Sequence, residues 1–126
     1  MTHDQAGTIL VVEDNEVTRA GLVKVLEQAG YSTVSAANGR EALDYLRSHP
    51  PPNLVLLDMF LPILDGWEFL AEARKGCLPI ASPIVITTGT IIKRDWALAH
   101  GCAGYVGKPI DAQELLQEIQ RCLTVL

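Results

Sequence analysis

Short apolar segments alternate with longer stretches of mixed polarity along the chain. The first apolar segment, Thr8–Val12, is a continuous run rather than an alternating one, as expected for a strand that is buried on both faces of a sheet. Four further segments have a strand-like composition: Tyr31–Ala37, Asn53–Asp58, Pro83–Thr88 and Ala103–Lys108. The pattern therefore predicts five β-strands.

The stretches between these segments carry the signals of helices. The first helix is expected to begin after Asn15 and to run to Gln28, with Gly30 as its C-terminal cap. Asp111 and Glu114 form an Asp-x-x-Glu capping signature that opens the last helix. Three other helices are predicted at Asn38–Ser48, at about Gly66–Gly76 and within Lys93–His100.

This alternation of five strands with five helices indicates the fold class. A strand that is followed by a helix and then by another strand favours a parallel sheet with helices on both faces. Because such crossovers are right-handed, the simplest solution is an α/β fold with a doubly wound five-stranded parallel sheet.

Composition and charge restrict the functional classes. A chain of 126 residues fits one domain, expected to cover 1–126 with a core at about 8–124 and no output domain. No apolar run approaches the roughly 20 residues of a membrane span, and no secretory signal precedes Ile9, so we expect a soluble, cytoplasmic protein. The net charge of −5 argues against a nucleic-acid surface. Three separated cysteines, Cys77, Cys102 and Cys122, are expected to be reduced and packed as small apolar residues.

Five polar residues stand where the predicted strands end. Glu13 and Asp14 follow the first strand, Asp58 ends the third, Thr88 ends the fourth and Lys108 ends the fifth. In an open parallel sheet, ligands bind beyond the carboxyl ends of the strands. We therefore expect these side chains to converge at one edge of the sheet.

The chemistry of this set indicates a phosphoryl site. Two carboxylates about 4 Å apart repel each other by roughly 4 kcal/mol at an effective dielectric near 20, so three of them require a cation. Oxygen ligands without histidine or cysteine favour Mg²⁺. Lys108 adds a positive charge and Thr88 a hydroxyl donor, which together suit a phosphoryl group with Asp58 as the nucleophile.

At these residues the chain resembles a known family, the CheY-like receiver domains of response regulators, from Ile9 to Leu123. The resemblance rests on VVEDN (Val11–Asn15), on LLDMFLPILDG around Asp58 with Pro62 and Gly66, on VITTG before Gly89, and on GYVGKP, which contains Tyr105 and Lys108-Pro109. Five motifs in order, with fitting spacing, form a specific signal. Thr88 is preferred to Thr87 because of its spacing from Asp58 (88 − 58 = 30) and the glycine that follows it.

The resemblance implies a function and roles for individual residues. It implies a flavodoxin-like sheet of strand order 2-1-3-4-5 and transfer of a phosphoryl group to Asp58 from a sensor histidine kinase or a histidine phosphotransfer protein. A signal would then pass through a Thr88–Tyr105 rearrangement to an unknown protein target at the face of the fourth helix, fifth strand and fifth helix. The Lys108-Pro109 peptide would be cis. The implied Mg²⁺ ligands are Glu13, Asp14, Asp58 and the backbone carbonyl of Phe60, and the implied phosphoryl ligands are Lys108 and Thr88.

Several features depart from the family pattern or leave alternatives open. Thr88 and Lys108 are 20 residues apart (108 − 88 = 20), which predicts a short or shifted fourth helix. The residues before Tyr105 lack an acidic pair, which argues against charged dimerisation and for a monomer or weak dimer. Tyr105 is either a switch residue or a half-buried strand aromatic. We also hypothesise that Phe60 shields the acyl phosphate from water.

Three other functional classes share parts of these features. A haloacid-dehalogenase-like phosphatase, which would be an enzyme, needs a second Asp two residues after the nucleophile, where this chain has Phe60. A flavodoxin-like cofactor binder needs a phosphate loop where Glu13 and Asp14 would repel phosphate. A receiver-shaped interaction module without phosphorylation is the third. The non-enzymatic switch is preferred.

Overall fold

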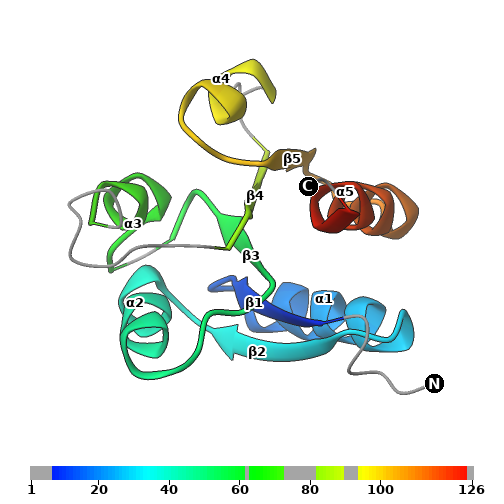
Figure 1. Ribbon diagram of the computed structural model, residues 1–126, viewed down its shortest axis with the longest axis horizontal. Helices are drawn as coiled ribbons and strands as arrows, with labels where there is room; N and C mark the ends of the chain where they lie inside the picture. Colours follow the sequence, from blue (N-terminus) through cyan, green and yellow to red (C-terminus); the bar gives the residue numbers. More distant parts are fainter. Residues whose placement is uncertain (1–6, 62, 73–81, 90–93, 125–126) are drawn as a thin grey trace.

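The computed structural model describes residues 7–61, 63–72, 82–89 and 94–124. Its elements alternate strictly between strand and helix along the chain (Figure 1). They are β1 (Thr8–Val12), α1 (Glu16–Gln28), β2 (Ser32–Ala36), α2 (Gly39–Ser48), β3 (Leu54–Asp58), α3 (Gly66–Glu72), β4 (Ile84–Thr88), α4 (Arg94–Ala99), β5 (Gly104–Gly107) and α5 (Ala112–Thr124).

The five strands form one parallel sheet in the order β2-β1-β3-β4-β5. The doubly wound sheet and its strand order are confirmed. β3 lies at the centre, and all five of its residues are buried, including Asp58. This position explains why its sequence is apolar up to the last residue.

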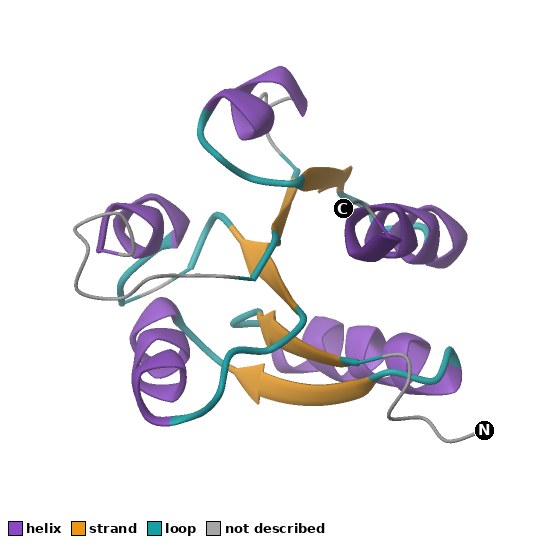
Figure 2. Ribbon diagram, viewed as in Figure 1, coloured by secondary structure: helices purple, strands orange, loops and turns teal. Residues whose placement is uncertain are grey.

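Helices cover both faces of the sheet (Figure 2). α1 and α5 lie on one face, where Leu22, Leu26, Leu115 and Ile119 pack on alternate residues of the strands. α2, α3 and α4 lie on the other face and contribute Ala42, Leu43, Phe69, Leu70 and Ala97. β1, β3, β4 and β5 therefore divide their side chains between two apolar cores, whereas the edge strand β2 contributes Val34 and Ala36 to the second of them only.

The helix ends follow the capping signals of the sequence. The side chain of Asn15 accepts a hydrogen bond from the backbone N–H of Thr18 at 2.8 Å, and Asp111 accepts one from Glu114 at 2.9 Å. Ala29 is the C-cap of α1, and Gly30 follows it with a φ of 99°, a conformation that glycine adopts without strain.

Several details of the helices differ from the expectations or lie outside the described residues. Within α1, Leu22 and Leu26 are buried, whereas Val17 is 82 % exposed. The described part of the fourth helix has six residues, and residues 90–93 before it lie outside the described residues, so its expected shortness stays a prediction. The expected continuation of the third helix to Gly76, together with Pro62 and Cys77, falls outside the described residues. No helix in the described part of the chain has both the length and the apolar composition needed to cross a bilayer.

Candidate functional site

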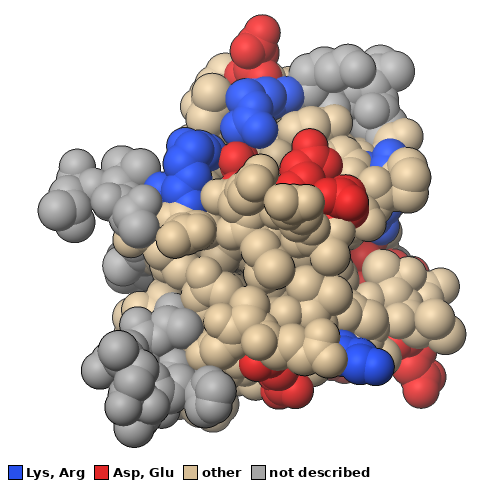
Figure 3. Space-filling view, turned by 90° about the vertical axis from the view of Figure 1, so that its right-hand side faces the viewer, with Lys and Arg blue, Asp and Glu red and all other residues tan. Residues whose placement is uncertain are grey.

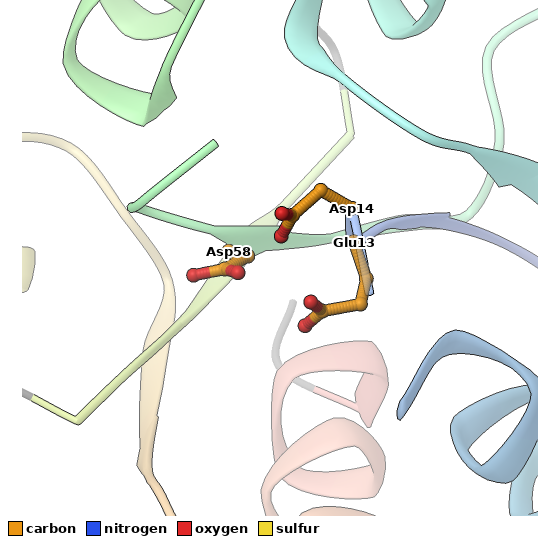
Figure 4. Close-up of side chains that lie close together, drawn as sticks. All are labelled: Glu13, Asp14 and Asp58. Atoms are coloured by element: carbon orange, nitrogen blue, oxygen red, sulfur yellow. The ribbon is translucent and has the colours of Figure 1, made fainter. Parts of the chain in front are cut away.

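Three carboxylates meet at the carboxyl edge of the sheet. Glu13 and Asp14 follow β1 and Asp58 ends β3, two strands that are neighbours in the sheet. Each offers a carboxylate oxygen within 4.8 Å of those of the other two, and the three side chains point into the same space (Figure 4). Glu13 and Asp58 are buried, and Asp14 is exposed. The convergence expected from the sequence is therefore present.

Lys108 crosses this edge from the end of β5. Its Nζ atom lies 3.2 Å from Oδ2 of Asp58 and 3.3 Å from Oε1 of Glu13. Burial alone would lower the pKa of Lys108, but the charges of Asp58 and Glu13 and the hydrogen bonds to them raise it. The ammonium group is therefore charged at neutral pH.

The surroundings of Glu13 raise the pKa of its carboxyl group. Burial raises the pKa of Glu13, and the charge of Asp58 raises it further, although the backbone N–H of Asn15 and the Lys108 ammonium act against both. One lysine thus faces two buried carboxylates and an exposed third, Asp14. This excess of negative charge and the oxygen-only donor set fit a hard divalent cation such as Mg²⁺.

The loop after Asp58 is tied to the nucleophile candidate. The backbone N–H of Phe60 donates to Oδ1 of Asp58 at 3.1 Å. Gly66 begins α3 directly against Met59, where a Cβ atom would come within 2.7 Å of the Met59 Cα. The Phe60 ring is about half exposed and meets the Trp67 ring edge to face at 5.0 Å between centroids. The apolar residues after Asp58 therefore pack the loop that carries it.

The remaining predicted residues lie on β4 and β5. Thr88 ends β4, and its carbonyl accepts the backbone N–H of Lys108 at 2.9 Å. Thr87 is paired with Asp58 in the sheet register, so the preference for Thr88 as the functional hydroxyl stays a prediction. Tyr105 is half-buried and packs against the core, and its hydroxyl would lie 3.2 Å from a Cβ added at Gly107. The Lys108-Pro109 peptide is cis, as the resemblance implied.

Comparison with known proteins settles the family. A family model described as the response regulator receiver domain matches residues 9–120. The chain belongs to the response regulator receiver domain family. Receiver domains are phosphorylation-based signalling switches of two-component systems and are in general not enzymes. They bind Mg²⁺ at an acidic pocket, and they interact with histidine kinases or phosphotransfer proteins and with downstream targets.

Individual relatives agree with this family. The chain is 35 % identical over 129 residues to the alkaline phosphatase synthesis transcriptional regulatory protein SphR of Synechococcus elongatus, covering 96 % of this chain and 49 % of SphR. It is 31 % identical to the polar-differentiation response regulator DivK of Brucella anthropi, covering 92 % of this chain and 95 % of DivK. The crystal structure of a putative response regulator from Chloroflexus aurantiacus superposes with a TM-score of 0.84 at 30 % identity, covering 94 % of this chain and 98 % of that one. The chain thus spans about half of one relative and nearly all of another.

A second polar cluster in this receiver domain joins α4, β5 and α5. The buried carboxylate of Glu118 on α5 accepts hydrogen bonds through Oε2 from Arg94 on α4 at 2.7 Å, from the backbone N–H of Tyr105 at 2.9 Å and from Arg121 at 3.0 Å. Burial alone would raise the pKa of Glu118, but the bonds from Arg121, Arg94 and Tyr105 lower it to about 2. A Cβ at Gly104 would come within 2.5 Å of Oε2, so glycine makes room for this carboxylate. Figure 3 shows the side of the domain that carries α5, where acidic and basic side chains are interspersed.

Two residues near the site were not identified from the sequence. Arg19, the fourth residue of α1, donates to the carbonyl of Glu13 at 2.8 Å. The sequence indicates this contact only through the position of a basic residue about one turn into the helix that follows the acidic pair. Ile63, in the loop after Asp58, has a φ of 50° and is followed by Leu64 at 35°, conformations that apolar side chains disfavour. No local sequence signal indicates these conformations.

Proposed function

We propose that this receiver domain is the switch of a two-component system or phosphorelay and accepts a phosphoryl group on Asp58. The observation that carries the proposal is the position of the Asp58 carboxylate. It ends the central strand with 3 % exposure, contacts the Lys108 ammonium at 3.2 Å and lies within 4.8 Å of two further carboxylates. A carboxylate that only ends a strand would be expected at the solvent-exposed surface, without a lysine and two further carboxylates around it.

The donor is a phosphohistidine of a sensor histidine kinase or a histidine phosphotransfer protein. A carboxylate oxygen of Asp58 attacks the phosphorus atom, an O–P bond forms and the N–P bond breaks. The leaving imidazole nitrogen keeps the electron pair and takes up a proton. Lys108 offsets negative charge on the Asp58 side, and the Phe60 N–H fixes the carboxylate by its bond to Oδ1.

The acidic cluster fits the Mg²⁺ of the family. Glu13, Asp14, Asp58 and the backbone carbonyl of Phe60 are the groups that would hold it. The bound ion supplies neutralisation of the charge on phosphoryl oxygens. The support from this chain is the donor set, which consists of oxygens only, and its surplus of negative charge, because three carboxylates lie near two cations, Lys108 and Arg19.

A groove beside Lys108 is suited to the phosphodonor. It lies between α1 and the connection from β5 to α5 and has a volume of about 410 Å³. Leu22, Val25, Pro109 and Ile110 contribute to its apolar lining, and Lys108 is part of the lining as well. A helix of a partner could place its phosphohistidine near Asp58 from this direction.

The output of the switch is a change of the face formed by α4, β5 and α5. Thr88 binds the phosphoryl group, and Tyr105 responds to its movement. The support is that Thr88 ends β4 beside Lys108, while Tyr105 lies on β5 next to α4. A downstream protein need only bind one of the two conformations better than the other. We further propose that this receiver domain acts in the cytoplasm as a monomer or weak dimer.

The test is intact-mass measurement after incubation with acetyl phosphate, with and without Mg²⁺. The unchanged chain is expected to gain one phosphoryl group only with Mg²⁺, and Asp58→Asn is expected to gain none. Asp65→Asn is the matched control, because Asn preserves the cap that Asp65 makes to the N–H of Glu68 at 2.9 Å while removing a carboxylate from the same loop. A folded, unmodified native chain would instead indicate a receiver-shaped interaction module.

A further inference from the structure

The main chain of the acidic loop has its own support from α1. Residues 13–15 carry two of the three carboxylates, and the loop begins with a bond from the N–H of Glu13 to the carbonyl of Ala36 at 3.0 Å. Its end is fixed by Asn15, which caps α1. Between these two points lies the peptide that joins Glu13 to Asp14.

Arg19 holds that peptide. Its NH1 atom donates to the carbonyl oxygen of Glu13 at 2.8 Å and lies 3.5 Å from the carbonyl oxygen of Asp14. Arg19 belongs to the second turn of α1 and is half-buried, so its guanidinium reaches the loop from a rigid element. A guanidinium is planar and permanently charged, and it makes short, directional bonds to carbonyl oxygens.

The carboxylates need such support because they repel one another. Glu13 is also fixed through its side chain, which accepts from the N–H of Asn15 at 3.1 Å and contacts Lys108 at 3.3 Å. Among the described residues, none donates a hydrogen bond to the carboxylate of Asp14. The direction of the Asp14 side chain is therefore set by the backbone of residues 13–14, which is the part that Arg19 holds.

We propose that Arg19 is a positioning residue for the divalent cation. By holding the Glu13–Asp14 peptide, it keeps both carboxylates directed at Asp58, so that its loss weakens Mg²⁺ binding although Arg19 is itself a cation. The inference rests on the proposed metal site at Glu13, Asp14 and Asp58.

The sign of the effect separates positioning from simple electrostatics. Removing a positive charge near a cation site raises the affinity for Mg²⁺, because a repulsion disappears. Loss of a group that orients metal ligands lowers the affinity, typically by about 10-fold to 100-fold. A neutral substitution at Arg19 therefore gives opposite results under the two explanations.

The experiment is a titration of the full chain with MgCl₂, followed by the backbone amide NMR signals of residues 13–15 and 58–60. Arg19→Gln is expected to raise the Kd for Mg²⁺ about 10-fold. Arg19→Lys, which can still donate one bond, is expected to recover part of the loss. Lys24→Gln removes an exposed cation from the same helix without touching the loop, and is expected to bind Mg²⁺ as the native chain does or slightly more tightly.

Two results would overturn the inference in distinguishable ways. If Arg19→Gln keeps native amide signals outside the loop and binds Mg²⁺ as tightly as the native chain or more tightly, Arg19 acts only through its charge. If the native chain itself shows no Mg²⁺-dependent signals, the proposed metal site is wrong and the positioning role falls with it.

Discussion

Replacement of Glu118 by Gln tests how much one buried carboxylate stabilises this fold. Glu118 is 8 % exposed and has a pKa of about 2, against 4.5 for an ordinary glutamate. At 1.36 kcal/mol per pKa unit, this difference corresponds to about 3 kcal/mol of stability at neutral pH. Glutamine keeps the size of the side chain, but it has no negative charge. Its NH₂ group, a donor, would also face N–H donors of Arg94, Arg121 or Tyr105 to which the carboxylate is an acceptor. Glu118→Gln is therefore expected to lower the free energy of unfolding at pH 7 by about 2–3 kcal/mol.

The sign of the pH dependence follows from the lowered pKa. The contribution of Glu118 is fully present above the unfolded pKa near 4.5 and is lost as the pH falls towards 2. About 2 of the 3 kcal/mol are already lost at pH 3. The difference in stability between the native chain and Glu118→Gln should therefore shrink on acidification, even though both proteins become less stable.

Urea unfolding at pH 7 and pH 3, followed by far-UV circular dichroism, measures both quantities. Glu114→Gln is the control, because Glu114 is an exposed carboxylate on the same helix and should change the stability by less than about 0.5 kcal/mol. A loss below about 1 kcal/mol at pH 7 for Glu118→Gln, or a loss of equal size at pH 3, would show that the carboxylate is not held as described.

Two further predictions concern the loop after Asp58. Ile63→Gly is expected to raise the free energy of unfolding by about 1 kcal/mol, because Ile63 is exposed and has a φ of 50°, which glycine adopts without strain. Thermal or urea unfolding measures this change, and an unchanged or lower stability would argue against backbone strain at residue 63. Phe60→Asn is expected to speed the loss of phosphate from Asp58 about tenfold, which corresponds to about 1.4 kcal/mol of barrier, as followed by intact mass after removal of acetyl phosphate. An unchanged lifetime would show that the half-exposed Phe60 ring does not shield the acyl phosphate.

The strands and the acidic edge could be predicted because their signals are local. β1 has the predicted bounds, and β3 begins one residue later than expected, since a strand buried on both faces must be apolar throughout. Once the strands are fixed, the parallel fold itself brings their carboxyl ends together, so Asp58 and Lys108 meet although 50 residues separate them. Only the topology was needed for this result.

The features that the sequence did not indicate depend on distant partners. In α1 the apolar residues recur at mixed spacing, and only the position of the sheet decides that Leu22 and Leu26 are buried while Val17 is exposed. Glu118 is a charged residue in a helix, which by itself indicates a solvated surface. Its burial depends on Arg94, 24 residues away, and on the space left by Gly104.

The Glu118 cluster also solves a problem of the sheet edge. β5 is the last strand of the sheet, so the backbone groups on its outer side have no strand partner. Glu118 accepts the N–H of Tyr105, Arg121 donates to the carbonyl of Ala103 at 2.9 Å, and Arg94 approaches the carbonyl of Tyr105 at 3.5 Å. Side chains of α4 and α5 thus satisfy backbone groups at the outer edge of β5, which ends at Gly107, one residue before Lys108. β5 carries Tyr105 near its beginning and is followed directly by Lys108. If the proposed phosphorylation of Asp58 displaces β5, we therefore expect the contacts of Arg94 with Glu118 and Tyr105, which join α4 to β5 and α5, to change with it.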